Sequence, residues 1–593
     1  MSGIFRDIRS YLRPFGRRIR AEKQAFLRWA DEVQSRERLT HVLPFYQWRR
    51  VLGRDIARAY VGKRSSSEKP RVLFATSYGF SEAMLCMEGI LQTALNLRGV
   101  DVATLECDHS LPACEFNRWG NGQPDPGEFG PDESRRTKLD RCRVCMDNTR
   151  EALALIPSTK LKFSQYLKAD DLDRIARLVD EESFETYGAV VYRGIAVGEQ
   201  AHSSVMRSQL RGTLEDNPET RWLFRRYLIS SILVCDLINR LFDDFDPQHL
   251  VTIHGVYVTH GTICDVARAR GIHVVVYGMP YRINTIWLSH HDTYHRTLIA
   301  LKSKDWDTFE LTPDRERLVD EYLADKRFGG RDYAGYHKGA IDDRDAFFEA
   351  SGLEPDKPIV ALFTNVLWDA QLYYRHNAFK TMLDWLFETI EYYLEKPETQ
   401  LAIRIHPAEA KGLMPTNQPL LPEIEKRFPT LPKHVVVIPP ESPLSSYTLA
   451  QESRAASIYG ARMGFEIAAL GTPLLVAGQT FNRGKGFSYD FETKEDYFRF
   501  LDRLDALEPN DDAKIGVAKK WAYHFLYRIM MDFPLLKLSN SVHLAEPELT
   551  FESTSALEPG ECPTLDQVCQ GICDPSVPFV VDTLDLPSTH KGA

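Results

Sequence analysis

The stretch that decides the fold is Leu401–Glu409, which reads LAIRIHPAE. A short apolar run ends at a histidine and a proline, and proline cannot donate a hydrogen bond to a strand ladder. The pattern predicts a buried strand over Leu401–Ile405 that leaves His406 at its carboxyl end. Ligands of parallel α/β sheets bind at that end, so His406 and the nearby Arg404 are candidate phosphate ligands. The alternative is a histidine that only satisfies a loop.

A second informative stretch is Ser457–Gly478, SIYGARMGFEIAALGTPLLVAG. It predicts a strand that ends at Gly460 and a helix that begins near Gly464, with Glu466 in its first turn. A glycine turn before a helix offers backbone N–H groups to phosphate, and a carboxylate there can accept hydrogen bonds from ribose hydroxyls. Just upstream, Ser442 precedes a proline at the entry of another predicted helix, a second N-terminus that can face an anion.

Short apolar strands alternate with helices on both sides of these motifs, which is typical of βαβ units and largely parallel sheets. The helices include Glu82–Leu97 and a long one around Arg221–Phe245. The predicted strands are Arg71–Ser77, Asp101–Glu106, Ala189–Arg193, Leu250–His254 and His273–Tyr277 in the first half, and Ile359–Phe363, Leu401–Ile405, Val435–Ile438, Ser457–Tyr459 and Leu474–Val476 in the second. The fold class is therefore α/β, with two Rossmann-like domains that face each other across a cleft.

The domain boundaries follow from changes in composition. The predicted parts are a basic amphipathic helical extension over 1–68, an N-terminal Rossmann-like acceptor domain over 69–300 with a cysteine-bearing insertion at 107–145, a connector over 301–357, a C-terminal Rossmann-like nucleotide-sugar domain over 358–535, and an acidic, Pro-rich and mostly extended tail over 536–593.

Composition narrows the class of protein. The chain has 593 residues, a formal net charge of −10 and 43% hydrophobic residues, so it is globular and has no global basic field to recruit nucleic acid. No apolar run reaches the roughly 18 residues of a membrane span. The first 20 residues contain no uninterrupted apolar stretch, so we do not expect them to be a secretory signal. The first 20 residues form a basic amphipathic pattern, which predicts either a helix on an anionic membrane surface or one docked on its own domain.

The order of the C-terminal motifs resembles the capsule polysaccharide biosynthesis family, which includes bacterial 3-deoxy-manno-octulosonic acid (Kdo) transferases, and is more distantly similar to other GT-B glycosyltransferases. The shared pattern is a strand ending in His-Pro, Ser-Pro-Leu before a helix, and a strand–glycine–helix with a glutamate and Gly-x-Pro. By this resemblance, the donor nucleotide contacts His406, Pro407, Gly460 and Glu466. Relatives often have Ser or Thr in the glycine turn, whereas this chain has none there and adds Arg462.

The N-terminal half must then supply the acceptor site and the catalytic group. Thr252–Gly261, TIHGVYVTHG, places His254 and His260 between a strand and a helix, where each is either a base near neutral pH or a structural residue. Glu82 is a second candidate base, or simply a carboxylate that favours a helix N-terminus. Arg193 closes a predicted strand and could bind an acidic acceptor.

Four of the ten cysteines gather in one insertion, at Cys107, Cys114, Cys142 and Cys145. Cys-x-x-Cys suits tetrahedral Zn²⁺ or one edge of an Fe–S cluster, so we predict one structural metal centre, with reduced thiols and disulfides as the alternatives. The acidic run Asp243–Asp246 is predicted to be a solvated helix end, and no cofactor is predicted to be required for catalysis, as in GT-B enzymes generally.

The leading hypothesis is a cytoplasmic glycosyltransferase, peripheral on the inner face of the cytoplasmic membrane, that builds a bacterial capsular or surface polysaccharide or glycolipid. Its partners would be a CMP-, UDP- or GDP-linked sugar, a saccharide or lipid-linked acceptor and an anionic membrane surface. Two alternatives keep the same fold: a nucleotide-sugar 2-epimerase, and a catalytically inactive GT-B scaffold.

Overall fold

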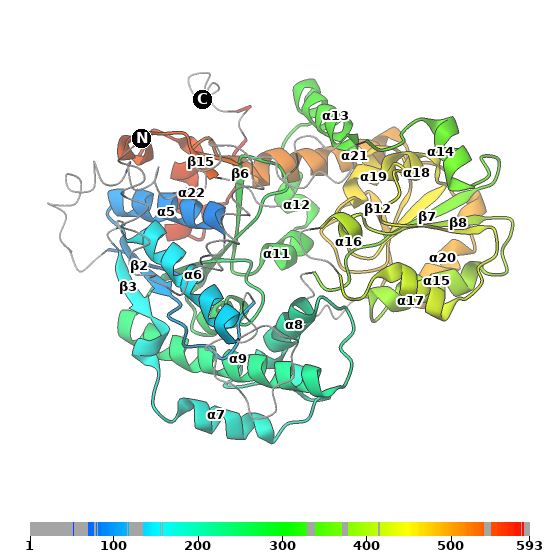
Figure 1. The fold of residues 1–593 in the computed structure, drawn as a ribbon. Coiled ribbons are helices and arrows are strands. Elements are labelled where there is room, and N and C mark those ends of the chain that lie inside the picture. The colour runs from blue at the N-terminus through cyan, green and yellow to red at the C-terminus, as the bar shows by residue number, and fades with distance from the viewer. Residues whose placement is uncertain are drawn as a thin grey trace, which may run out of the picture.

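Two parallel-stranded sheets, each between layers of helices, make up the structure (Figure 1), a computed structural model. It describes residues 51, 69–75, 79, 81–115, 117, 135–154, 156, 158–328, 332, 339–369, 377–412, 416–538, 547–582 and 584–585. The amphipathic helix predicted for residues 1–20 lies outside these ranges. No helix within them is both long and apolar enough to cross a bilayer.

The N-terminal sheet has the order β13-β6-β5-β4-β1-β2-β3. Its strands run parallel except β6 and β13, which pair antiparallel with their neighbours. The bounds are β1 Arg71–Phe74, β2 Asp101–Glu106, β3 Thr159–Lys162, β4 His249–Ile253, β5 His273–Gly278, β6 Thr285–His290 and β13 Met531–Asp532. Its helices are α5 (Glu82–Leu97), α6 (Arg135–Leu153), α7 (Asp171–Asp180), α8 (Val197–Gln209), α9 (Pro218–Phe245), α10 (Gly261–Ala269) and α11 (Tyr294–Ala300), with 3-10 turns η2 (Phe163–Tyr166) and η3 (Tyr187–Ala189).

The C-terminal sheet has the order β12-β11-β10-β7-β8-β9, and all of its pairs are parallel. The bounds are β7 Ile359–Phe363, β8 Gln400–Arg404, β9 Val435–Ile438, β10 Ala455–Ile458, β11 Leu474–Val476 and β12 Ser488–Asp490. Its helices are α15 (Met382–Tyr393), α16 (Ala408–Lys411), α17 (Leu420–Arg427), α18 (Ser446–Glu452), α19 (Gly464–Ala469) and α20 (Lys494–Leu501), followed by the turn η4 (Leu504–Ala506). The predicted α/β class with two Rossmann-like domains is confirmed.

Two helical segments link the domains. The connector contains α12 (Ser303–Trp306), α13 (Pro313–Arg327) and α14 (Arg344–Ser351). The second link is α21 (Asp512–Tyr523), which continues into the π-helical turn η5 (His524–Ile529) and returns the chain to the N-terminal sheet at β13. The predicted boundary at residue 535 is therefore too late, because β13 pairs with β6 of the other domain.

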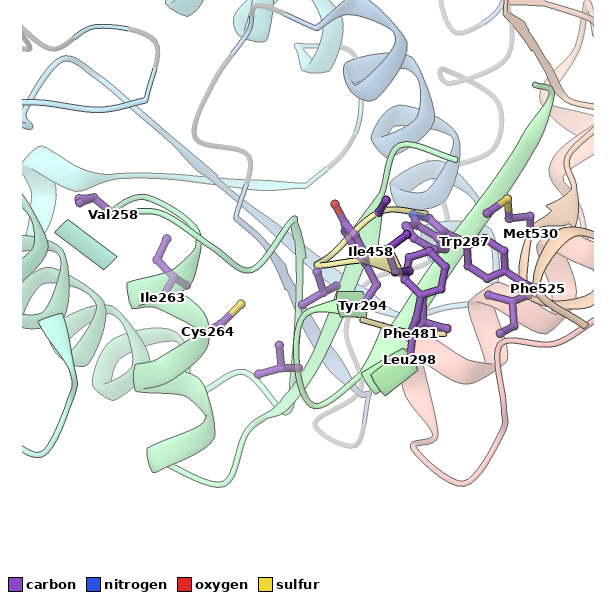
Figure 2. Packing of buried hydrophobic residues seen from close by; sticks show 14 of the residues in the cluster. Val258, Ile263, Cys264, Trp287, Tyr294, Leu298, Ile458, Phe481, Phe525 and Met530 are labelled. Carbon is purple, nitrogen blue, oxygen red and sulfur yellow. The ribbon is translucent and has the colours of Figure 1, made fainter. Parts of the chain in front are cut away.

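The hydrophobic core is continuous where the two domains meet, as Figure 2 shows. Trp287 of β6 and Phe481, which follows β11, both pack against Phe525 of η5, with ring centroids 5.8 and 4.9 Å apart. Tyr294 of α11 lies against the other side of Trp287, at 4.3 Å. Burial of such large aromatic side chains is strongly stabilising, so this cluster holds the two sheets in a defined relation.

One predicted strand is absent. Ala189–Arg193 begins at the end of η3 and then forms an isolated bridge between Tyr192 and Ile195. β2 is paired with β1 on one side, and the strand on its other side is β3, which was not predicted. The prediction was wrong because Val191 is 64% exposed, so this apolar run is not a buried strand. Arg193 and Gly194 both take positive φ angles, which ends the extended run.

The predicted extended tail is also wrong. Residues 536–573 contain the hairpin β14 (Leu536–Leu538) and β15 (Pro547–Leu549), the turn η6 (Thr554–Leu557) and the helix α22 (Pro563–Cys573). The buried side chains of α22 include Leu565, Val568 and Ile572, at helical spacing, and they pack into the core that contains α5. This short stripe is diluted by the surrounding acidic and proline residues, which hid its periodicity.

Candidate functional site

A cavity of about 680 Å³ lies between the carboxyl ends of the two sheets. The C-terminal domain lines it with the ends of β7, β8, β10 and β11, and the N-terminal domain with α8, α11 and the loop after β5. Six of the residues predicted to bind the donor line this cavity: Arg404, His406, Pro407, Gly460, Arg462 and Glu466. Ser442 and Gly464 do not line it.

His406 is held in one orientation by the backbone. The backbone N–H of Ala408 donates to Nδ1 of His406 at 3.0 Å, and the backbone N–H of His406 donates to Oγ1 of Thr364 at 3.1 Å. A neutral imidazole that accepts at Nδ1 carries its proton on Nε2. Thr364 follows β7 and also lines the cavity, so two adjacent strand ends fix the position of this N–H donor.

Arg404 acts mainly beneath the cavity. It is only 4% exposed, and its guanidinium donates to the carbonyls of Pro439 at 2.6 Å and Ser442 at 3.2 Å, and to Oγ of Ser446 at 3.2 Å. Burial lowers the pKa of Arg404 to about 10. Its cation therefore orders the loop that leads into α18, and Ser442 contributes a carbonyl to this loop rather than a side chain to a ligand.

The start of α19 is less open to an anion than predicted. Oδ1 of Asn482 accepts a hydrogen bond from the backbone N–H of Phe465 at 3.0 Å. A Cβ atom on Gly464 would lie 2.5 Å from Nδ2 of the same asparagine, so glycine is needed there for close packing. The prediction that Gly464 serves a phosphate is not supported, because a side chain already occupies this end of the helix.

Glu466 belongs to a buried network of charges. Its Oε1 lies 2.9 Å from Nζ of Lys326, and its Oε2 accepts a hydrogen bond from the Tyr447 hydroxyl at 2.6 Å. Asp332 lies 2.7 Å from Nζ of Lys326 and 2.6 Å from Nη2 of Arg462. Oε2 of Glu466 is therefore hydrogen-bonded, whereas Oε1 forms ion pairs but accepts no hydrogen bond from the described residues, and the residue lines the cavity.

Lys326 and Asp332 come from the connector and were missed by the sequence analysis. Burial alone would lower the pKa of Lys326, but the carboxylates of Asp332 and Glu466 hold it well above its usual range. Nothing in the charged sequence of α13 distinguishes Lys326 from its solvated neighbours; only the fold brings it to Glu466.

The two domains touch at several points around the cavity. The guanidinium of Arg462 lies 4.4 Å from the ring centroid of Tyr281, which follows β5. Oε1 of Gln418 accepts hydrogen bonds from the backbone N–H groups of Gly212 and Thr213, both at 2.9 Å. Arg207 of α8 lies 3.3 Å from Asp369 of the C-terminal domain. A ligand in the cavity would therefore contact both domains at once.

The N-terminal wall of the cavity offers its own polar side chains, none of them predicted. They include Glu199 and His202 of α8 and His295 of α11. Oε1 of Glu199 accepts a hydrogen bond from Arg296 at 2.6 Å, while the ring of His202 stacks on Phe224. Burial lowers the pKa of His295 to about 4, and the carboxylate of Asp369 opposes that shift. His295 is thus a neutral imidazole at the wall of the cavity.

The structure does not bring the four predicted N-terminal residues to the cavity. The loop after β4 turns through positive φ angles at His254 and Tyr257, and His254 forms a 2.9 Å hydrogen bond with the Tyr294 hydroxyl. His260 is 1% exposed, and burial lowers its pKa to about 3. Glu82 is the first residue of α5, and Arg193 pairs with Asp236 at 3.1 Å.

The four clustered cysteines lie near one another and form no disulfide bond. Burial raises the pKa of all four thiols, and nearby cysteines add to this shift at Cys107, Cys114 and Cys145. Asn117 donates to Sγ of Cys142 at 3.0 Å, and the backbone N–H of Gly79 donates to Sγ of Cys145 at 2.9 Å. In the part of the chain that the structure describes, however, no group of three or more His, Cys, Asp or Glu side chains is arranged to hold a metal ion. The predicted metal centre is therefore not supported by this arrangement.

No family model and no curated protein matches this chain. Solved structures similar to it include a β-Kdo 2,4-transferase, KpsC, from Thermosulfurimonas dismutans, with 14% identity, 52% of this chain and 87% of that chain covered, and a TM-score of 0.31. UDP-GlcNAc 2-epimerase from Neisseria meningitidis, bound to UDP-GlcNAc, has 11% identity, with 77% of this chain and 99% of that chain covered, and a TM-score of 0.23. Spinosyn rhamnosyltransferase SpnG has 11% identity, with 77% of this chain and 96% of that chain covered, and a TM-score of 0.23. With identities and TM-scores this low, these similarities do not assign a function to this chain.

Proposed function

We propose that the protein is a glycosyltransferase that moves a sugar from a nucleotide donor to a saccharide or lipid-linked acceptor. The observation that carries the proposal is the cavity between the carboxyl ends of two facing sheets, with His406 held at one wall as an Nε2–H donor. Ligands of α/β sheets bind at this edge, and a cavity of this size accommodates a nucleotide sugar.

The C-terminal wall would bind the donor. His406 would donate from Nε2 to a phosphate oxygen, and Gly460 lets the chain approach the phosphates without a side chain in between. When the bond between the anomeric carbon and the phosphate oxygen breaks, the electron pair stays on the phosphate. A hydrogen-bond donor aimed at that oxygen stabilises the developing charge.

The N-terminal wall would bind the acceptor. The acceptor hydroxyl forms the new bond to the anomeric carbon and loses its proton, so it needs a base within hydrogen-bond reach. His295 meets the chemical requirement, because it is neutral and lines the cavity. The contacts of Arg207 and Gln418 across the cleft would let the domains exclude water from the reacting centre.

Two measurements test this proposal. Titration of CMP, UDP and GDP by calorimetry should identify one nucleotide that binds the wild-type protein and binds more weakly to His406→Ala. Nucleotide release from the matching sugar donor should then depend on an added saccharide acceptor. Failure of all three nucleotides to bind would overturn the proposal.

A nucleotide-sugar 2-epimerase is the second candidate. The carboxylates of Glu199 and Asp369 line the cavity from opposite domains, and epimerisation needs acid and base groups beside the donor. An epimerase would convert the donor sugar without acceptor, whereas a transferase needs an acceptor to release nucleotide.

We further propose that the protein works in the cytoplasm, peripherally at the inner face of the cytoplasmic membrane, on a capsular or surface polysaccharide or glycolipid. The support for the membrane is the arginine-rich amphipathic pattern of residues 1–20. The polysaccharide class rests on the motif resemblance.

A further inference from the structure

Three histidines form a chain of hydrogen bonds at the edge of the N-terminal sheet that faces away from the cavity. His249 begins β4, His273 begins β5 and His290 ends the antiparallel β6. Nδ1 of His249 lies 3.0 Å from Nδ1 of His273, and Nε2 of His273 lies 2.9 Å from Nδ1 of His290. Nε2 of His290 lies 2.9 Å from the carbonyl oxygen of Val577, in the segment after α22.

The last bond determines the direction of the whole chain. A carbonyl oxygen can only accept, so His290 donates from Nε2 to Val577. Neutral His290 then accepts at Nδ1 from Nε2 of His273, and neutral His273 accepts at Nδ1 from Nδ1 of His249. One proton added to His290 can be accommodated, because Nδ1–H of His290 can donate to Nε2 of His273 while His273 donates from Nδ1 to His249. When His273 and His290 are both charged, Nε2–H of His273 faces Nδ1–H of His290, and no hydrogen bond joins them.

The surroundings favour the neutral rings at neutral pH. Burial, together with the neighbouring His290, His249 and His291, lowers the pKa of His273 to about 4. Burial also lowers the pKa values of His249 and His290. The groups that oppose these shifts are the carboxylate of Asp574 and the carbonyls of Ile572 and Val577, all of them in or just before the C-terminal segment.

The carbonyl oxygen that accepts the last of these hydrogen bonds belongs to residues 574–582. This segment also contacts the helix α21–η5 that links the two domains. We call it the strap. The ring of Phe579 stacks on His290 at 4.2 Å, and the backbone N–H of Val581 donates to the carbonyl of Arg528 in η5 at 3.1 Å. Asp582 accepts a hydrogen bond from the Tyr523 hydroxyl of α21 at 2.8 Å and pairs with Arg315 of α13 at 3.1 Å.

We propose that the strap fastens the interdomain helix α21–η5 to the N-terminal sheet, and that protonation of the histidine chain releases it in mildly acidic solution. When His273 and His290 are both charged, the hydrogen bond between them is lost, and the two adjacent imidazolium rings repel each other. The strap would then separate from β6, and α21–η5 would lose the contacts that Val581 and Asp582 make with it. This inference does not depend on the proposed transferase activity.

Hydrogen–deuterium exchange of the full-length protein tests the proposal. Exchange is measured at about pH 7.5, 6.5 and 5.5, and each rate is divided by the intrinsic rate at that pH, since an ordinary histidine titrates in this interval. Protection of peptides that contain Val581 should fall by about tenfold or more between the highest and lowest pH, the change expected for loss of one buried hydrogen bond or more. Peptides from α15 should keep their protection.

The double variant His273→Gln/His290→Gln keeps a donor and an acceptor at each position but cannot titrate there. It should retain strap protection at about pH 5.5, whereas the matched control His434→Gln, at the far side of the C-terminal sheet, should behave as wild type. The proposal is overturned if wild-type strap protection is unchanged across this pH range, or if it falls together with that of α15. Equal loss in the double variant would also overturn it. If the double variant does not fold, the pH dependence of strap protection in the wild-type protein is the test of the proposal.

Discussion

The ammonium group of Lys326, in the connector, lies 2.9 Å from Oε1 of Glu466, at the start of the helix behind the cavity. The same ammonium group lies 2.7 Å from Asp332, which also pairs with Arg462. The positive charges of Lys326 and Arg462 thus balance the negative charges of Asp332 and Glu466 where the connector meets the C-terminal domain. The predicted contact of Glu466 with a ribose hydroxyl stays a prediction, since Glu466 lines the cavity and its Oε1 accepts no hydrogen bond from the described residues.

Removal of one member of this network should be costly. Lys326→Met leaves Asp332 and Glu466 buried with one cation fewer, and we expect a loss of about 3–5 kcal/mol of unfolding free energy. The double variant Lys326→Met/Glu466→Gln should recover part of this loss, which denaturant unfolding would measure as a coupling energy. Lys357→Met, which breaks an exposed pair with Glu354, should cost no more than about 1 kcal/mol. Additive effects of the two network substitutions would contradict the coupling.

The His406→Ala variant should lose nucleotide affinity while its melting temperature stays nearly unchanged. A hydrogen bond to a charged phosphate is lost, at a cost of about 1.5–3 kcal/mol of binding. Calorimetric titration beside a thermal melt measures both quantities. His434→Ala is the control, because His434 hydrogen-bonds the Tyr393 carbonyl away from the cavity; it should leave nucleotide binding as in wild type. Wild-type affinity in His406→Ala would remove this residue from the donor site.

Replacement of His295 should affect transfer more than binding. His295→Asn should reduce the transfer rate by about 10²–10⁴-fold, the usual effect of losing a general base, with nucleotide affinity nearly unchanged. Because burial lowers the pKa of His295 to about 4, wild-type activity should be flat through neutral pH and fall only as pH approaches that value. An activity that falls already between about pH 7 and 6 would assign the base to a group with an ordinary histidine pKa.

The same lowered pKa has a consequence for stability. Unfolded His295 would bind a proton near pH 6.5, whereas the folded residue binds one near 4, so its contribution to stability is lost as pH falls through this interval. Urea unfolding of wild type and His295→Asn at about pH 7 and 5 should therefore show a smaller drop with acid in the variant. An equal drop in both proteins would argue against a buried neutral imidazole.

The metal prediction is decided by elemental analysis. If Cys107, Cys114, Cys142 and Cys145 bind one structural ion, protein purified without oxygen should carry about one equivalent of zinc, or iron with visible absorbance. Cys142→Ser/Cys145→Ser should abolish that content, whereas Cys235→Ser, deep in α9, should not. If the protein contains neither zinc nor iron, the predicted metal centre does not exist and the four cysteines are reduced thiols. EDTA should leave initial transfer rates unchanged if no metal acts at the reaction centre.

Deletion of residues 1–20 should reduce cosedimentation with anionic liposomes and leave activity on a soluble acceptor unchanged. Binding through arginine side chains should weaken as salt rises, because surface charges are screened. Neutral liposomes provide the control. If the full-length protein does not bind anionic liposomes even at low ionic strength, this segment belongs to the fold rather than to a membrane contact.

Sequence periodicity alone predicted most of the strands of both sheets. β2, β7, β9 and β11 match their predicted ranges, and the position of His406 followed from the proline after β8. Such predictions succeed because parallel strands buried on both faces are apolar runs, and because a strand's carboxyl end is defined by its own chain. Periodicity did not detect the short, polar β3 and β12 or the antiparallel β6 and β13, and it mistook the exposed run at Val191 for a strand.

The sequence by itself therefore determined the α/β class, the two domains and the edge of the C-terminal sheet that carries His406, Gly460 and Glu466. Only the tertiary structure decided what surrounds these residues. It brought Lys326 to Glu466 and His295 to the opposite wall, it buried His260, and it joined His254 to the Tyr294 hydroxyl. The physical reason is that strand and helix patterns depend on neighbours in the chain. Ion pairs and cavity walls instead depend on which distant segments the packing of the core places together.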